Sequence, residues 1–226
     1  MKLFKYTILT AILLVSFSCK PSTKASKEVA IKVAPEKVML SAEELQEYET
    51  AYFASGCFWC VEAIFESVKG VKEVISGYSG GVKENPTYRE VAYGLTRHAE
   101  AVEVYYDPKV ISFQKLVQVF FGSHDPTTLN RQGPDSGAQY RSVAFYKNET
   151  EKKIINDYIN LLVSKSVYDS PIVTEVSKFE VFYPAEDYHQ DYEKKNPNNS
   201  YIRAVSVPRL NRFKENFQGY LKEDAH

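Results

Sequence analysis

Gly-Cys-Phe-Trp-Cys at residues 56–60 decides the fold, because a strand pattern ends just before it and a helix pattern begins within it. Residues 50–54 predict a strand, and apolar residues then recur at helical spacing over residues 58–68. Gly70 is expected to end this helix. Cys57 therefore stands at a helix N-terminus, where unpaired backbone N–H groups and the helix dipole favour thiolate over thiol.

Cys60 lies three residues after Cys57, nearly one helical turn, so both thiols are expected on the same side of the helix. Their α-carbons would then lie within reach of a disulfide. A nucleophilic thiolate, a second thiol and two aromatic neighbours, Phe58 and Trp59, together predict a redox site. The alternative interpretation of Cys60 is a buried small residue without a chemical role.

The composition is that of an ordinary globular protein, with 226 residues, 44% of them hydrophobic and 25% charged. This length predicts a single domain that can bury a sizeable core. The formal net charge of −1 gives no reason to expect a nucleic-acid partner, and we expect a monomer.

Residues 1–18 have the form of a signal peptide, with Lys2 and Lys5, an apolar run over residues 6–17 and a small residue before Cys19. A cysteine directly after such a segment resembles the lipobox of bacterial lipoproteins, in which it is acylated after cleavage. We therefore expect a lipid anchor at Cys19 and a place in the bacterial cell envelope, on the periplasmic or outer-membrane side. Plain secretion and an uncleaved membrane anchor are the alternatives.

The rest of the chain divides into a predicted flexible tether over residues 19–47, a folded domain over residues 48–215 and a C-terminal tail over residues 216–226. Ser41 followed by Glu44 is the pattern of a capping box, which predicts a short helix before the domain. A merely polar part of the tether is the alternative.

Within the domain, strand and helix patterns alternate. Further strands are predicted over residues 71–76, 99–106, 139–146 and 172–182, helices over 112–122 and 150–163, and long loops over 77–88 and 124–138. The stretch after Tyr183 shows little regular signal. This order predicts an α+β fold, an α/β two-layer sandwich that forms a single mixed-sheet domain with a βαβ core and long functional loops.

Glu100 is expected near the head of the strand over residues 99–106, on the face that it shares with Val102 and Val104. Burial on that face would raise the pKa of the carboxyl group and keep it protonated, ready to donate a proton. A solvated position at the strand end is an equally weighted alternative. His98 is interpreted as a hydrogen-bonding loop residue rather than a base.

The two long loops carry polar side chains suited to a site. Asn-Pro-Thr-Tyr at 85–88 offers the phenol of Tyr88, although a turn with a packed tyrosine is the favoured interpretation when the motif is taken alone. Residues 130–141 hold two arginines, Asp135 and Tyr140. An anion-binding loop is one interpretation of this segment, although no phosphate-loop pattern occurs there. A solvated charged loop is the alternative.

Four segments in this order resemble the peptide methionine sulfoxide reductases of type A. They are Gly-Cys-Phe-Trp at 56–59, Asn-Pro-Thr-Tyr at 85–88, Gly-Leu-Thr-Arg-His-Ala-Glu at 94–100 and Arg-Gln-Gly-Pro-Asp-Ser-Gly-Ala-Gln-Tyr-Arg-Ser at 131–142. Tyr-His-Gln at 188–190 is similar to the C-terminal segment of that family. The resemblance covers residues 50–213 and implies reduction of the S epimer of methionine sulfoxide in proteins, without a bound cofactor, and leaves the use of free methionine sulfoxide open. A metal site is not expected, because no second pair of Cys or His residues has the spacing of zinc ligands.

The resemblance also implies a role for each matching residue. Cys57 would attack the sulfoxide sulfur, Glu100 would protonate the sulfoxide oxygen, and Tyr88 and Tyr140 would donate hydrogen bonds to it. Asp135 would organise the site. Phe58 and Trp59 would hold the substrate methyl group in an apolar pocket.

Cys60 departs from the family pattern, in which the residue after the tryptophan is usually glycine. No cysteine follows it, so we predict that Cys60 resolves a sulfenic acid on Cys57 by forming a disulfide. A thioredoxin-like protein would then reduce this disulfide, and oxidised envelope proteins would be the substrates. The alternatives are a thioredoxin-like disulfide oxidoreductase that uses Cys57 and Cys60, and a binding module with a structural disulfide.

Overall fold

The computed structural model describes residues 40–223 of the chain. The predicted signal peptide over residues 1–18, Cys19 and the tether up to residue 39 lie outside the described residues, as do residues 224–226. None of the helices in residues 40–223 is long and apolar enough to cross a membrane.

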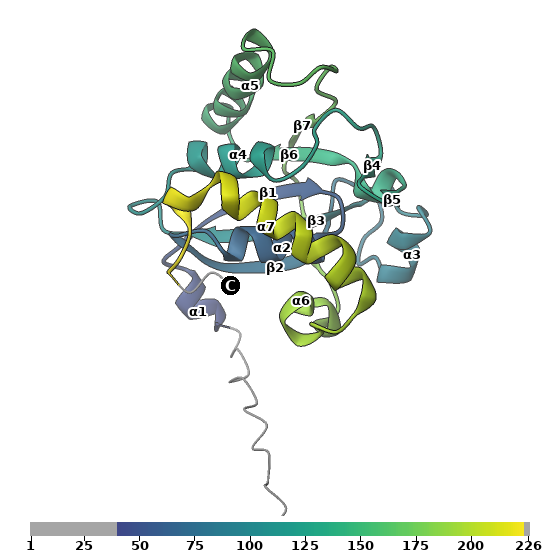
Figure 1. Ribbon diagram of the computed structural model, residues 1–226. Coiled ribbons are helices and arrows are strands. Elements are labelled where there is room, and N and C mark those ends of the chain that lie inside the picture. Colours follow the sequence, from purple (N-terminus) through teal and green to yellow (C-terminus); the bar gives the residue numbers. More distant parts are fainter. Residues whose placement is uncertain (1–39, 224–226) are drawn as a thin grey trace, which may run out of the picture. The chain divides into compact units, whose positions relative to one another are not determined.

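Strands and helices alternate through much of the described domain (Figure 1). The strands are β1 (Glu49–Ser55), β2 (Val71–Ser79), β3 (Ala99–Tyr106), β4 (Arg131–Gln132), β5 (Asp135–Ser136), β6 (Ser142–Tyr146), β7 (Glu175–Lys178) and β8 (Phe182–Pro184). The helices are α1 (Ala42–Leu45), α2 (Phe58–Glu66), α3 (Tyr88–Ala92), α4 (Phe113–Gly122), α5 (Glu149–Ser164), α6 (Tyr192–Lys195) and α7 (Val207–Asn216).

A six-stranded mixed sheet in the order β7-β6-β1-β3-β2-β8 forms the centre. Strands β1 and β2 each pair antiparallel with β3, so they run parallel to each other with β3 between them. Helix α2 connects β1 to β2 and packs on β2 and β3. This arrangement is the predicted βαβ core, and it confirms the mixed-sheet α+β fold.

The main hydrophobic core lies between the sheet and helices α2 and α4. Phe53 of β1 is fully buried, and its ring stacks on Phe65 of α2 at 5.2 Å and on Phe120 of α4 at 5.1 Å between ring centroids. Burying such a side chain contributes on the order of 2–3 kcal/mol. These contacts fix α2, which carries Cys57 at its N-cap, relative to the sheet.

The opposite face of the sheet is covered by the chain itself. Tyr52, the neighbour of Phe53 in β1, stacks on Phe179 with 3.7 Å between ring centroids. Phe179 lies in the segment between β7 and β8, which are the two edge strands of the sheet. The single strand predicted over residues 172–182 is therefore wrong, because this segment crosses a sheet face and pairs at each end with a different strand.

The C-terminal stretch after Tyr183 is more regular than its sequence indicates. It contains α6, a π-helical turn over Ile202–Ser206 and the ten-residue helix α7, which packs against α2 (Figure 1). Helix α7 buries Arg209 beside Leu210 and Phe213. A charged residue at a core-facing position weakens the apolar periodicity by which a helix is predicted.

Ser41 forms the predicted capping box. Its side chain accepts a hydrogen bond from the backbone N–H of Glu44, and the Glu44 carboxylate accepts one from the Ser41 N–H at 2.9 Å. The helix that it starts is a single turn and ends at Leu45. A short turn over residues 46–48 then leads into β1.

Candidate active site

A cavity of about 230 Å³ gathers most of the predicted site residues. It is lined by Cys57, Phe58, Trp59, Tyr88, Glu100, Asp135, Tyr140, Asn199 and Tyr201. These residues come from both ends of the domain. Cys60 does not line the cavity; it is buried, and its thiol shares a hydrogen bond with that of Cys57. Cys19 lies outside the described residues.

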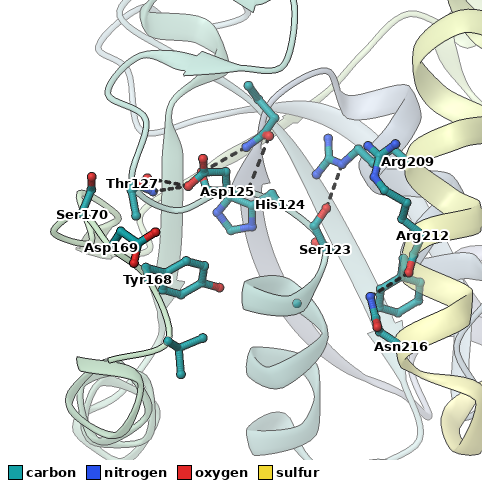
Figure 2. A pocket seen from close by; sticks show the side chains of 14 residues that line it. Ser123, His124, Asp125, Thr127, Tyr168, Asp169, Ser170, Arg209, Arg212 and Asn216 are labelled. Carbon is teal, nitrogen blue, oxygen red and sulfur yellow. Dashed lines mark hydrogen bonds between the residues drawn. The ribbon is translucent and has the colours of Figure 1, made fainter. Parts of the chain in front are cut away.

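A larger cavity of about 660 Å³ opens between the end of α4, residues 167–170 and α7 (Figure 2). Its lining includes His124, Arg209 and Arg212 but none of the predicted site residues. Sulfur chemistry requires a thiol, so we assign the candidate active site to the smaller cavity.

Gly56 makes the sharp turn that delivers Cys57 to the cavity. Its φ of +92° lies in a region that residues other than glycine rarely adopt. A β-carbon at this position would lie 2.6 Å from Cβ of Gln132. The side chain of Gln132 in β4 can therefore lie against the turn after β1 only because residue 56 is glycine.

Glu100 is buried, with 1% of its surface exposed, so the solvated alternative is wrong. Burial raises the pKa of its carboxyl group to about 8, although the Phe58 backbone N–H donates a hydrogen bond to Oε2 at 3.1 Å. The group is therefore mostly protonated at neutral pH. A neutral carboxyl beside Cys57 is a proton donor and does not repel a negative charge on sulfur.

The prediction that the helix N-terminus favours a Cys57 thiolate is wrong for the resting site. Burial raises the pKa of the Cys57 thiol well above its ordinary value, and the hydrogen bond with Cys60 and the charge of Glu100 add to this effect. The Phe58 N–H, which would stabilise a thiolate, donates to Glu100 instead.

Cys60 carries the lower pKa of the two thiols. Its hydrogen bond with Cys57 lowers its pKa to about 6 against the opposing effect of burial, and the positive charge of Arg209 contributes. In the resting pair, the negative charge therefore resides on Cys60, with the Cys57 thiol as its hydrogen-bond donor. A proton that moves along this bond turns Cys57 into the thiolate.

Tyr88 and Tyr140 line the same cavity as Glu100. Tyr88 begins α3, whose first turn is capped by Thr87. Burial and the nearby Glu100 raise the pKa of Tyr88 to about 12 and raise that of Tyr140 further. Both phenols thus remain protonated donors throughout the physiological range.

Asp135 acts through a tyrosine that the sequence analysis missed. Tyr201 donates a hydrogen bond from Oη to Asp135 Oδ2 at 2.5 Å, and its Oη also lies 3.8 Å from Sγ of Cys60. Asn199 fixes this position by accepting the Tyr201 backbone N–H at 2.9 Å. Asp135 is thereby connected to the sulfur pair, with burial raising its pKa.

Phe58 and Trp59 form the apolar wall of the cavity. The Trp59 ring stacks on Tyr192 with 3.8 Å between centroids, and its Nε1 donates to Nδ1 of His189 at 3.1 Å. His189 is itself buried, and burial lowers its pKa, so it accepts this bond as a neutral ring. The sequence analysis recorded His189 only as part of a family-like tripeptide.

His98 has the loop role predicted for it. Its Nδ1 accepts the backbone N–H of Gly81 at 3.0 Å, and its Nε2 lies 2.8 Å from the carbonyl oxygen of Lys83. Both ring nitrogens are therefore engaged in holding the loop after β2, and neither reaches the cavity.

Among residues 40–223, Glu62, Glu66 and Asp191 form a cluster with metal-ligand spacing. Lys194 pairs with Glu66 at 2.5 Å and with Asp191 at 3.3 Å. Burial raises the pKa of Glu62 to about 8. A lysine and a protonated carboxyl already balance the charge that a metal ion would neutralise, so we interpret the cluster as structural.

Comparison with known proteins agrees with this geometry. The family model described as peptide methionine sulfoxide reductase matches residues 49–221. A peptide methionine sulfoxide reductase MsrA of Natronomonas pharaonis is 50% identical over 168 residues, which are 74% of this chain and 94% of the relative. Another, from Synechocystis, is 41% identical over 216 residues, or 95% of this chain and 99% of the relative.

Solved structures show the same fold. The reduced form of Mxr1 from Saccharomyces cerevisiae matches with a TM-score of 0.64 and 34% identity, over 68% of this chain and 88% of that chain. Methionine sulfoxide reductase A of Corynebacterium diphtheriae matches with a TM-score of 0.61 and 37% identity, over 68% of this chain and 77% of that chain.

Proposed function

The chain belongs to the peptide methionine sulfoxide reductase family and is a peptide-methionine (S)-S-oxide reductase; on this premise we propose how its own residues perform the reaction. The observation that carries the proposal is a buried, protonated Glu100 in one small cavity with the Cys57 thiol and two phenols. The oxygen of a sulfoxide leaves readily only when it is protonated, and this cavity supplies protons where the sulfur is attacked.

In the first step, the substrate methyl group packs against Phe58 and Trp59, and the sulfoxide oxygen faces Glu100 and the two phenols. The Cys57 thiolate bonds to the substrate sulfur while Glu100 gives its proton to the oxygen. The oxygen then passes to Cys57 as a sulfenic acid, and methionine leaves. The substrate sulfur gains the two electrons that the Cys57 sulfur loses.

In the second step, Cys60 resolves the sulfenic acid. The Cys60 thiolate bonds to Sγ of Cys57, the S–O bond breaks, and hydroxide leaves and takes up a proton to become water. The shared hydrogen bond between the two thiols supports this step, because it places Cys60 beside the sulfur that it must attack.

The disulfide needs a dithiol reductant, and a thioredoxin-like protein is the class that we propose. Such a donor attacks with a thiolate, forms a mixed disulfide and then oxidises its own second thiol, which returns Cys57 and Cys60 to the reduced state. To measure the reduction of the disulfide directly, the oxidised enzyme is mixed with thioredoxin, its NADPH-dependent reductase and NADPH. The loss of NADPH absorbance gives the rate of reduction.

We also propose that the enzyme repairs oxidised proteins in the bacterial cell envelope, held there by a lipid on Cys19. The support is the signal-like pattern over residues 1–18, which ends at that cysteine. Mass spectrometry of the mature N-terminus and fractionation of a Cys19→Ala variant test it. A variant that stays with the membrane as firmly as the natural protein would contradict the anchor.

One assay tests the reaction as a whole. Resolved S and R epimers of a peptide methionine sulfoxide are incubated with the enzyme and dithiothreitol, and methionine is quantified. The S epimer should be consumed and Cys57→Ser should be inactive. A protein that instead reduces insulin disulfides and leaves both epimers untouched is a thioredoxin-like oxidoreductase, and the proposal is then wrong.

A further inference from the structure

Arg209 is a buried cation that forms no ion pair with a carboxylate within the described part of the chain. Its side chain on α7 is 7% exposed. Nε donates to the carbonyl oxygen of Ser123 at 2.9 Å, as Figure 2 shows, and Nη2 donates to Oγ of Ser55 at 3.3 Å. Both acceptors are neutral, and no Asp or Glu oxygen among residues 40–223 lies within 4.0 Å of it. A buried charge in this position needs a negative group nearby.

The guanidinium lies next to the turn that precedes Cys57. Ser55 ends β1, and Nη1 of Arg209 would lie 3.4 Å from a β-carbon on Gly56. Ser206, one turn before Arg209, forms a hydrogen bond with Cys60. Since α7 packs on α2, Arg209 of α7 and Ser206 of the π-helical turn before it approach the sulfur pair from the same side.

The charge of Arg209 acts on two ionisable groups of the site, the Cys60 thiol and the carboxyl group of Asp135. At Cys60 it favours the ionised form of the thiol. His124, which lines the large cavity beside Arg209, offers no counter-charge, because burial holds its pKa at about 3 and the ring is neutral.

We propose that Arg209 is a positioning residue for the recycling half of the reaction, where its charge stabilises Cys60 as the thiolate that attacks and later as the thiolate that leaves. This inference rests on the proposed function, because it requires Cys60 to resolve Cys57. In resolution, the S–S bond forms as the S–O bond of the Cys57 sulfenic acid breaks and water is released. In reduction, the thiolate of the donor dithiol bonds to Sγ of Cys57, and Cys60 departs with the electron pair.

This assignment gives the disulfide a direction. The thiol with the more stable thiolate leaves faster, so the donor should attack Cys57 and not Cys60. A mixed disulfide trapped with a donor that lacks its second cysteine should therefore join the donor to Cys57.

Other groups near Cys60 also affect its ionisation, and some of them oppose the effect of Arg209. Cys57 lies before it on the same helix, Tyr201 lies 3.8 Å away, and the negative charges of Glu100 and Asp135 lie around the same cavity. Glu100 is mostly protonated below about pH 8, so its opposing charge appears only above that pH. Arg209 is the cation that acts on Cys60.

The test compares Arg209→Gln with Arg209→Lys, which keeps the charge, and with Arg212→Gln, which removes an exposed arginine one turn further along α7. Each reduced enzyme receives one equivalent of methionine sulfoxide, and quenched samples are analysed for methionine, sulfenic acid and the Cys57–Cys60 disulfide. Because the pKa of Cys60 is about 6, a rise of one pKa unit in Arg209→Gln should slow disulfide formation about tenfold at pH 5 but only about twofold at pH 7. Its rate against pH should shift upward by about one unit, while Arg209→Lys and Arg212→Gln stay close to the natural enzyme.

Equal rates of disulfide formation in Arg209→Gln and the natural enzyme would overturn the inference and leave the proposed function intact. A natural enzyme that forms no disulfide with Cys60 would overturn this inference and the resolving role of Cys60, while reduction of methionine sulfoxide by Cys57 would stand. Should Arg209→Gln not fold, alkylation of Cys60 is followed in a Cys57→Ala protein with intact Arg209, which lacks the Cys57 hydrogen-bond donor. A midpoint below the ordinary cysteine pKa of about 8.5 supports the inference, and one at or above it contradicts the inference.

Discussion

The two sides of the sulfur pair differ in charge. On the cavity side, Cys57 meets a protonated carboxyl and two phenols, all of them neutral donors at neutral pH. On the α7 side, Cys60 meets the cation of Arg209. The difference matches the two half-reactions, because removal of oxygen consumes a proton whereas disulfide exchange needs a stabilised thiolate. Variants that alter one side alone should affect one half-reaction.

The largest effect on the cavity side is expected for Glu100→Gln. The amide keeps the shape but donates its proton poorly, so the single-turnover rate should fall by about 10²–10³-fold. Glu100 must be protonated to act, and its pKa is about 8, so the rate of the natural enzyme should decline as the pH rises through about 8. Rates between pH 6 and 9.5 check this, and Glu100→Gln should lack the decline.

The result that would contradict this role is a descending limb near pH 8 that survives in Glu100→Gln. The rise in the single-turnover rate at low pH has a different cause. The rate should rise as the thiol pair ionises near pH 6, because Cys60 loses its proton there and Cys57 is its hydrogen-bond donor. Glu100→Gln should keep this rise.

Cys60→Ser should give the next largest effect, on the other side of the pair. The variant should still release one equivalent of methionine per enzyme and then stop, since no thiol is left to resolve the sulfenic acid. Turnover with a thioredoxin-like donor should fall at least about tenfold. Steady-state rates with the donor, beside a burst measurement without it, separate the two. Unchanged recycling would remove Cys60 from the mechanism.

The cavity side follows largely from the sequence, because its residues lie in segments with strong local patterns. Helical spacing after Cys57 and alternation around Glu100 correctly predict α2 and β3. Alternation indicates which face Glu100 shares, but only the covering helix α2 and the Phe58 N–H determine that it is buried and hydrogen-bonded. Tertiary packing therefore decides between two interpretations that the pattern alone leaves open.

The α7 side does not follow from the sequence. Tyr201 and Arg209 lie in a stretch whose buried positions include a charged residue, which interrupts the apolar stripe by which a helix is predicted. The ionisation of Cys57 was also predicted wrongly. A dipole argument counts the free N–H groups of a helix end, whereas here one of them binds Glu100 and burial opposes the charge.

Tyr201→Phe tests the connection between the two sides. It removes the donor to Asp135 and the hydroxyl near Cys60 while keeping the ring. A buried hydrogen bond to a charged group contributes about 1.5–3 kcal/mol, so we expect a loss of about tenfold or more, shared between methionine release and disulfide formation. Asp135→Asn, which keeps an acceptor for the phenol, should be affected less. A loss confined to one step would place Tyr201 on that side only.

The smallest effect should come from His189→Phe, which changes neither side directly. It removes the acceptor of the Trp59 Nε1 proton and leaves the indole held by its stacking on Tyr192. The methyl pocket should loosen, so KM should rise about threefold to tenfold while kcat changes little, because a lost hydrogen bond of about 1 kcal/mol affects binding of substrate and transition state alike. His189→Asn, whose amide oxygen can accept, should restore part of this. The natural protein contains a single tryptophan, so its fluorescence reports the change independently of activity. A fall in kcat with an unchanged KM would show instead that the wall formed by Trp59 acts on the reacting oxygen.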